Sequence, residues 1–140
     1  MRNHDELREF AQLFAPRGGR SCFEPNTDVL VDERDRAVIV QLELAGADAD
    51  SLKVTVDGDY LTIAGARAQR DVARDASLLR KEIQYGEFQT IIRLPVAVLA
   101  DGAVAQYRDG ILSIRLPLAQ SQEMPIVRTT IRMTVRRTPA

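Results

Sequence analysis

The sequence predicts an all-β fold: an antiparallel β-sandwich with a short N-terminal helical arm and an extended C-terminal tail. Several short runs alternate apolar and polar residues, and turns rich in glycine and aspartate separate them at intervals of roughly ten residues. No long helical pattern lies between the runs, which argues against a parallel α/β sheet. The 140 residues divide most simply into an arm at 1–25, one domain at 26–118 and a tail at 119–140.

The composition is that of an ordinary soluble chain. The formal net charge is −1, so the chain as a whole has no electrostatic attraction to nucleic acid or to an anionic membrane. No apolar run approaches the roughly 20 residues that span a bilayer, and the charged N-terminus does not resemble a signal peptide. The single cysteine, Cys22, leaves only an intermolecular disulfide open. We therefore expect a cytoplasmic protein.

The N-terminal arm is expected to contain a short amphipathic helix over residues 5–14. Its apolar side chains recur at near-helical spacing, at Leu7, Phe10, Leu13 and Phe14. A proline and two glycines over residues 16–19 then end the helix. Two interpretations remain open: the helix docks on the body, or its apolar face binds client proteins.

The first strands are predicted from alternation with a period of two, which begins near residue 29. Over residues 38–44 every second residue is apolar, which places these side chains on one face of a strand. After a break at 45–47, residues 52–56 alternate again, and a turn at 57–59 leads to a strand rich in β-formers over 60–64.

A long charged stretch, residues 67–75, interrupts the pattern of strands. It precedes a candidate short strand over 78–83, and a further strand follows over 88–92. Hairpin loops usually have two to five residues, so this connection is long for an ordinary hairpin. One interpretation that stays open for this connection is an ordinary hairpin with a solvated tip.

The strongest local signal is a closing hairpin around Asp109-Gly110. Apolar and polar residues alternate on both sides of this pair, and both residue types tolerate positive φ angles.

Four motifs, in this order, resemble those of the small heat-shock protein family, whose common domain is the α-crystallin domain. They are LELAGA at 42–47, LKVTVDGDYLTIAG at 52–65, YGEF with IRLP within 85–95, and AQYRDGIL at 105–112. The first departs from the family because Ala45 stands where proline is usual. The resemblance covers residues 26–118, about two thirds of the chain, and implies an immunoglobulin-like β-sandwich of the bacterial and plant type.

The function implied by this resemblance is that of an ATP-independent holdase chaperone, which binds partly unfolded proteins and prevents their aggregation under stress. Such a protein needs exposed apolar surface and unpaired strand edges, and it needs no catalytic group or cofactor. The alternative is a non-enzymatic adaptor or co-chaperone domain that binds one specific folded partner. The long connection at 67–75 favours the holdase.

The resemblance also assigns three surfaces. A strand exchanged between the two copies of a dimer would carry Leu78, Leu79, Arg80 and Glu82. A groove for a neighbour's tail or for a client would be lined by Leu52, Val54, Val56, Val104, Leu112 and Ile114, although each of these residues is equally consistent with plain core. No strict I-x-I or I-x-V motif is present in the tail, so the anchor would be Ile131, Met133 and Val135, which alternation over 131–135 places on one face of an extended strand. This degenerate anchor and the short arm predict dimers or small oligomers.

The chain offers little for catalysis or metal binding. One histidine, His4, and one cysteine do not make a metal site, and no glycine-rich phosphate-binding motif occurs. We therefore expect no catalytic residue, cofactor or metal. The tail carries arginines at 128, 132, 136 and 137. A solubilising arm that shields strand edges is favoured over a weak nucleic-acid contact.

Overall fold

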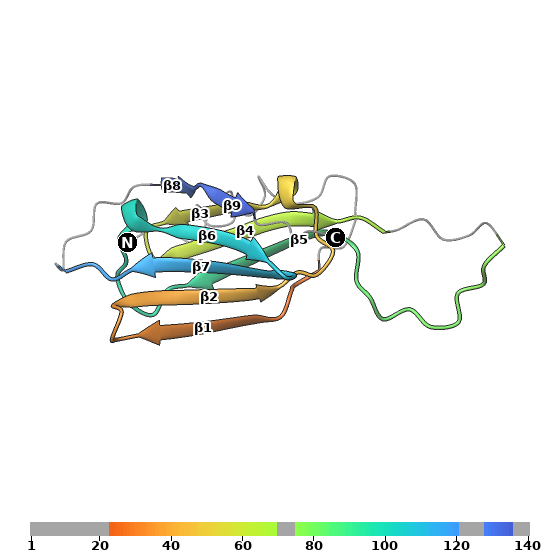
Figure 1. The fold of residues 1–140 in the computed structure, drawn as a ribbon, viewed down its shortest axis with the longest axis horizontal. Coiled ribbons are helices and arrows are strands. Elements are labelled where there is room, and N and C mark those ends of the chain that lie inside the picture. Colours follow the sequence, from red (N-terminus) through yellow and green to blue (C-terminus); the bar gives the residue numbers. More distant parts are fainter. Residues whose placement is uncertain (1–22, 70–74, 121–127, 136–140) are drawn as a thin grey trace, which may run out of the picture.

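The computed structural model describes residues 23–69, 75–120 and 128–135, and these residues form a β-sandwich of two sheets (Figure 1). Its strands are β1 (Thr27–Asp32), β2 (Ala37–Glu43), β3 (Lys53–Asp57), β4 (Tyr60–Arg67), β5 (Gly86–Arg93), β6 (Val104–Arg108), β7 (Ile111–Pro117), β8 (Arg128–Ile131) and β9 (Met133–Val135). Two short 3₁₀ helices, η1 (Ala49–Ser51) and η2 (Ala100–Gly102), lie in the connections. The predicted all-β sandwich is confirmed, whereas the predicted helix at 5–14 lies outside the described residues.

The two sheets have the strand orders β1-β2-β7-β6-β9 and β5-β4-β3-β8. Neighbouring strands are antiparallel except for β6 and β9, which are parallel. Both sheets therefore end in a strand from the C-terminal tail on one side of the sandwich, and in β1 and β5 on the other side.

The core lies between the sheets, and much of it consists of inward-facing residues from the predicted strands. Its completely buried side chains include Val38, Val40 and Leu42 of β2, Leu112, Ile114 and Leu116 of β7, and Leu61 and Ile63 of β4. Because β-strands alternate their side chains, the residues between these positions face outward. For β2 and β7, the period of two alone is therefore sufficient to identify the core residues.

The closing hairpin has the turn that its sequence predicts. Asp109 and Gly110 have φ angles of 53° and 77°, which are those of a turn with two left-handed residues. A side chain at Gly110 would place its Cβ 3.0 Å from the Cα of Ala45, so this position requires glycine for space as well as for backbone conformation. The hairpin thus packs directly on the turn that follows β2.

The predicted strand at residues 78–83 is wrong for the single chain. The described residues between β4 and β5 contain no strand, and Figure 1 shows this segment extending away from the body. A strand exists only where its N–H and C=O groups have a neighbouring edge to bond, and none lies beside this segment within the described chain. Residues 78–83 therefore do not pair as a strand in one copy alone.

Candidate partner-binding surfaces

Strand β1 is an unpaired edge of the five-stranded sheet. It pairs with β2 on one side and with no other strand of the residues that the structure describes. Three consecutive apolar side chains remain exposed on it, Val29 at 42%, Leu30 at 49% and Val31 at 42%. An edge with unpaired backbone groups and apolar side chains is a template for another strand. β1 is therefore a candidate site for backbone pairing with a second polypeptide.

The segment that carries the predicted exchange residues is exposed along its whole length. Leu78, Leu79, Arg80 and Glu82 all lie at the surface, as does Ile83. Leu79 is 95% exposed and Leu78 is 67% exposed, which are large fractions for leucine. Neighbouring apolar side chains that the body leaves uncovered are typical of a surface that another molecule covers.

The predicted groove residues do not form one open surface. Leu52, Val54, Val56, Leu112 and Ile114 are buried in the core, whereas Val104 is 53% exposed at the start of β6. The geometry agrees with the core interpretation for five of the six residues. What remains of a groove is the pair of strand edges above this core, on β3 and β6.

The chain's own tail lies on both of these edges. β8 runs antiparallel to β3 with Ile131 opposite Val54, and β9 runs parallel to β6 with Met133 opposite Ala105. Arg132 alone separates the two strands. Ile131 is 6% exposed and belongs to the core, Met133 is half-buried against that core, and Val135 is 36% exposed. The tail therefore completes both sheets at once.

The predicted client-binding arm, with Leu7, Phe10, Leu13 and Phe14, lies outside the described residues. The described chain begins at Phe23, which sequence reasoning did not single out. The Phe23 side chain is 7% exposed, and its ring centroid lies 5.4 Å from that of Phe88. The Phe23 backbone N–H also donates to the carbonyl oxygen of Glu87 at 3.2 Å. The arm is thus anchored at β5.

Within the described residues, the side chains offer non-covalent binding rather than metal chemistry. No group of three or more His, Cys, Asp or Glu residues in this part of the chain is placed to hold a metal ion. The same residues contain no helix of the length and apolarity needed to cross a membrane. The features with a clear binding capacity are the strand edges and the exposed apolar segment described above.

Comparisons with known proteins are consistent across sequence and structure. The sequence model described as the Hsp20/alpha crystallin family matches residues 30–134. Small heat shock protein C4 of Rickettsia felis is 34% identical over 93 residues, which are 66% of this chain and 56% of that protein. Small heat shock protein C2 of the same organism is 30% identical, with 66% of this chain and 59% of that protein covered. The chain thus matches less than two thirds of the length of these relatives.

Solved structures share the fold. The hspA protein from Xanthomonas axonopodis is 28% identical with a TM-score of 0.62, and the match covers 70% of this chain and 96% of that chain. A small heat-shock protein from Xylella fastidiosa is 25% identical with a TM-score of 0.62, and the match covers 76% of this chain and 96% of that chain. The Xylella fastidiosa protein is described as having a distinct high order structure.

Proposed function

Because this chain belongs to the Hsp20/alpha crystallin family, we propose that it is an ATP-independent holdase chaperone. In this proposal it binds partly unfolded proteins during stress and keeps them from aggregating. The activity is binding alone, so it uses no catalytic group and no cofactor. A protein that binds unfolded and nearly unfolded chains lowers the concentration of free non-native chain by mass action. It also covers the apolar surface that would otherwise aggregate.

The observation that carries this proposal is an exposed apolar segment together with an unpaired apolar strand edge on the same chain. Residues 78–83 present Leu78, Leu79 and Ile83 to solvent, and β1 presents Val29, Leu30 and Val31. Non-native chains expose apolar side chains and unsatisfied backbone groups, which pair with surfaces of this kind.

We also propose that two copies form a dimer by exchanging residues 78–83. In this arrangement the segment of one copy adds to the β1 edge of the other, and the same contact is made twice about a two-fold axis. The dimer contact and a client would therefore compete for these two surfaces, and a client would bind them when the two copies separate. The proposal is supported by the length of β1, six residues, which equals that of the segment. Self-association in general is also supported by the high order structure named for the Xylella fastidiosa relative. Larger assemblies would be small oligomers of this dimer.

The edges of β3 and β6 are proposed as the third surface. Here a neighbour's tail or a client takes the place of the chain's own tail, with Ile131, Met133 and Val135 as the anchor. The short β9, with three residues, and methionine in place of a branched aliphatic residue favour a tail that exchanges readily.

Replacing Leu78 and Leu79 together with aspartate is expected to abolish the dimer at micromolar protein. Neighbouring side chains in a strand point to opposite faces, so changing both places at least one carboxylate in the interface. Burial of an unpaired carboxylate costs several kcal/mol, which corresponds to a dissociation constant about a hundredfold higher or more. The measurement is sedimentation equilibrium over a range of concentrations.

The matched control replaces Val96 and Leu99 with aspartate, because these side chains are 40% and 45% exposed and lie outside both surfaces. This control should dimerise like the unchanged chain. Equal dimerisation by all three proteins would contradict the strand exchange.

Co-elution tests the holdase activity itself. A heat-labile client, warmed with this protein in buffer without ATP, is expected to remain soluble and to elute with it in one large complex. If instead no client binds, and the protein forms a stoichiometric complex with one folded partner, the adaptor interpretation replaces the holdase.

A further inference from the structure

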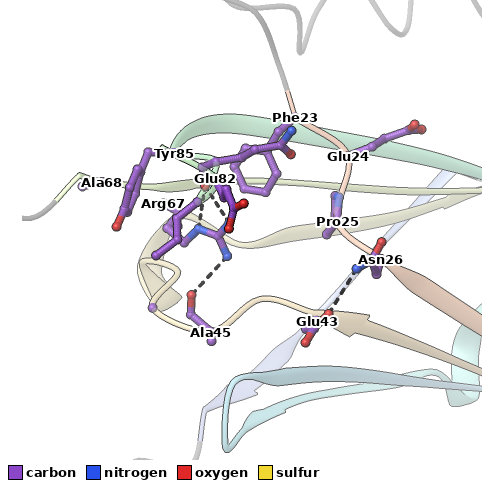
Figure 2. Close-up of a pocket in the computed structure, with 13 residues that line it drawn as sticks. Phe23, Glu24, Pro25, Asn26, Glu43, Ala45, Arg67, Ala68, Glu82 and Tyr85 are labelled. Atoms are coloured by element: carbon purple, nitrogen blue, oxygen red, sulfur yellow. Dashed lines mark hydrogen bonds between the residues drawn. The ribbon is translucent and has the colours of Figure 1, made fainter. Parts of the chain in front are cut away.

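The side chain of Arg67 joins the two ends of the long connection between β4 and β5. Arg67 is the last residue of β4, where the connection leaves the body. Its Nε and Nη2 atoms donate to the carbonyl oxygen of Gln84 at 2.9 and 2.6 Å, close to where the connection returns. Its Nη1 atom donates to the carbonyl oxygen of Ala45 at 3.2 Å (Figure 2). One guanidinium group therefore bonds to the return end of the connection and to the turn after β2.

Two aromatic rings lie against the same guanidinium group. The central carbon of Arg67 is 4.7 Å from the centroid of the Phe23 ring and 5.9 Å from that of the Tyr85 ring. The Nζ atom of Lys81 lies 5.2 Å from the Tyr85 ring centroid. Cations over aromatic faces gain electrostatic attraction, and arginine can combine this stacking with in-plane hydrogen bonds. We call Arg67, Phe23, Ala45, Gln84 and Tyr85 the Arg67 cluster.

The Arg67 cluster unites three chain segments that are distant in sequence. Phe23 is where the N-terminal arm meets the body, Ala45 follows β2, and Gln84 and Tyr85 follow the exposed segment 78–83. Backbone pairing of β4 with β5 reaches only as far as Arg67 and Gly86. Beyond that pair, the side chain of Arg67 supplies the next contact across the base of the connection.

We infer that Arg67 is a positioning residue for exchange of residues 78–83 between two copies, an inference that rests on the dimer proposed above. Two donors on one carbonyl fix where Gln84 lies and, with the stacked Tyr85, set the direction in which residues 78–83 leave the body. A binding segment fixed in this way loses less conformational entropy when it pairs with a partner, so association is tighter.

The geometry distinguishes arginine from lysine at this position. The planar guanidinium presents fixed donors to two carbonyl oxygens and a flat face to two rings. Lysine keeps the positive charge but offers a compact ammonium that cannot reproduce this set of directions. A role in positioning is therefore lost in Arg67→Lys, whereas a role of charge alone is retained.

The test measures dimer dissociation constants for the full chain and its Arg67→Ala and Arg67→Lys variants by sedimentation equilibrium. Both variants are expected to weaken the dimer about tenfold or more, the scale of a lost hydrogen bond to a charged group. The matched control is Arg115→Ala, because Arg115 makes a single bond to a backbone carbonyl, that of Asp35 at 3.1 Å, and lies outside the cluster. The control should dimerise normally.

Hydrogen exchange on the same samples separates positioning from general stability. Amides of residues 84–88 should exchange faster in both Arg67 variants, while those of β2 and β7 stay protected as in the unchanged chain. An unchanged dissociation constant in Arg67→Ala, or full recovery in Arg67→Lys, would overturn the inference. If the unchanged chain is itself monomeric, the proposed dimer fails, and unaltered exchange at 84–88 would then overturn the contact role of Arg67 separately.

Discussion

Replacing Phe88 with alanine is expected to lower the free energy of unfolding by about 3–5 kcal/mol. Phe88 is 1% exposed and is the largest fully buried side chain among the residues that the structure describes. Its ring packs beside Phe23 and fills the space over Gly65, where an added Cβ would lie 2.6 Å from the Phe88 Cζ atom. Removing the ring therefore leaves a cavity bounded by β4, β5 and the anchored end of the arm.

Urea unfolding followed by circular dichroism measures this loss. A domain is typically stable by about 5–15 kcal/mol, so the expected change is a large part of the total. Ile91→Ala is the control on the same strand, since Ile91 is 38% exposed and its loss should cost well under the Phe88 value. A Phe88→Ala variant no less stable than Ile91→Ala would contradict the packing described for this end of the core.

The second large effect is expected from Ile131→Ala, which should weaken the free energy of tail docking by about 2–5 kcal/mol. Ile131 is 6% exposed and lies opposite Val54, so its side chain connects β8 to the core. β8 and β9 are terminal strands, and they can detach while the remaining strands stay paired. The expected result is local release of the tail, with global unfolding little affected.

Hydrogen exchange detects this release at the strand edges. Amides of β3 and β6 that bond to the tail should exchange faster in Ile131→Ala, while those of β2 stay protected. Arg132→Ala is the control, because Arg132 is exposed and lies between the two tail strands. Unchanged protection of β3 and β6 in Ile131→Ala would show that Ile131 does not secure the tail.

Most of the fold is predictable because its signals are local. The alternation over 38–44 and 52–56 identifies β2 and β3, the β-forming residues over 60–64 identify β4, and Asp109-Gly110 identifies the closing turn. Each of these signals involves residues within one strand or one turn, where side-chain period and backbone preference act directly. Alternation does not separate β1 from β2, because Val29, Leu30 and Val31 are three apolar residues in a row and do not alternate with polar ones.

The parts that sequence reasoning missed depend on contacts between distant residues. Residues 78–83 are a candidate strand in the sequence, but the sequence does not say whether an edge lies beside them. The sequence places Arg67 in a charged stretch, and nothing local shows that its side chain reaches Gln84 and Phe23. Alternation singles out Ile131 and Met133, whereas their places on β3 and β6 follow from the fold of the whole chain.

Light scattering of a heat-labile client is the most direct test of the holdase proposal. The client is warmed in buffer without ATP, alone, with this protein, or with an equal mass of an inert protein. The proposal predicts that this protein suppresses the rise in scattering near stoichiometric ratios and that the inert protein does not. Scattering that rises equally in all three samples across the temperature range would contradict the holdase function.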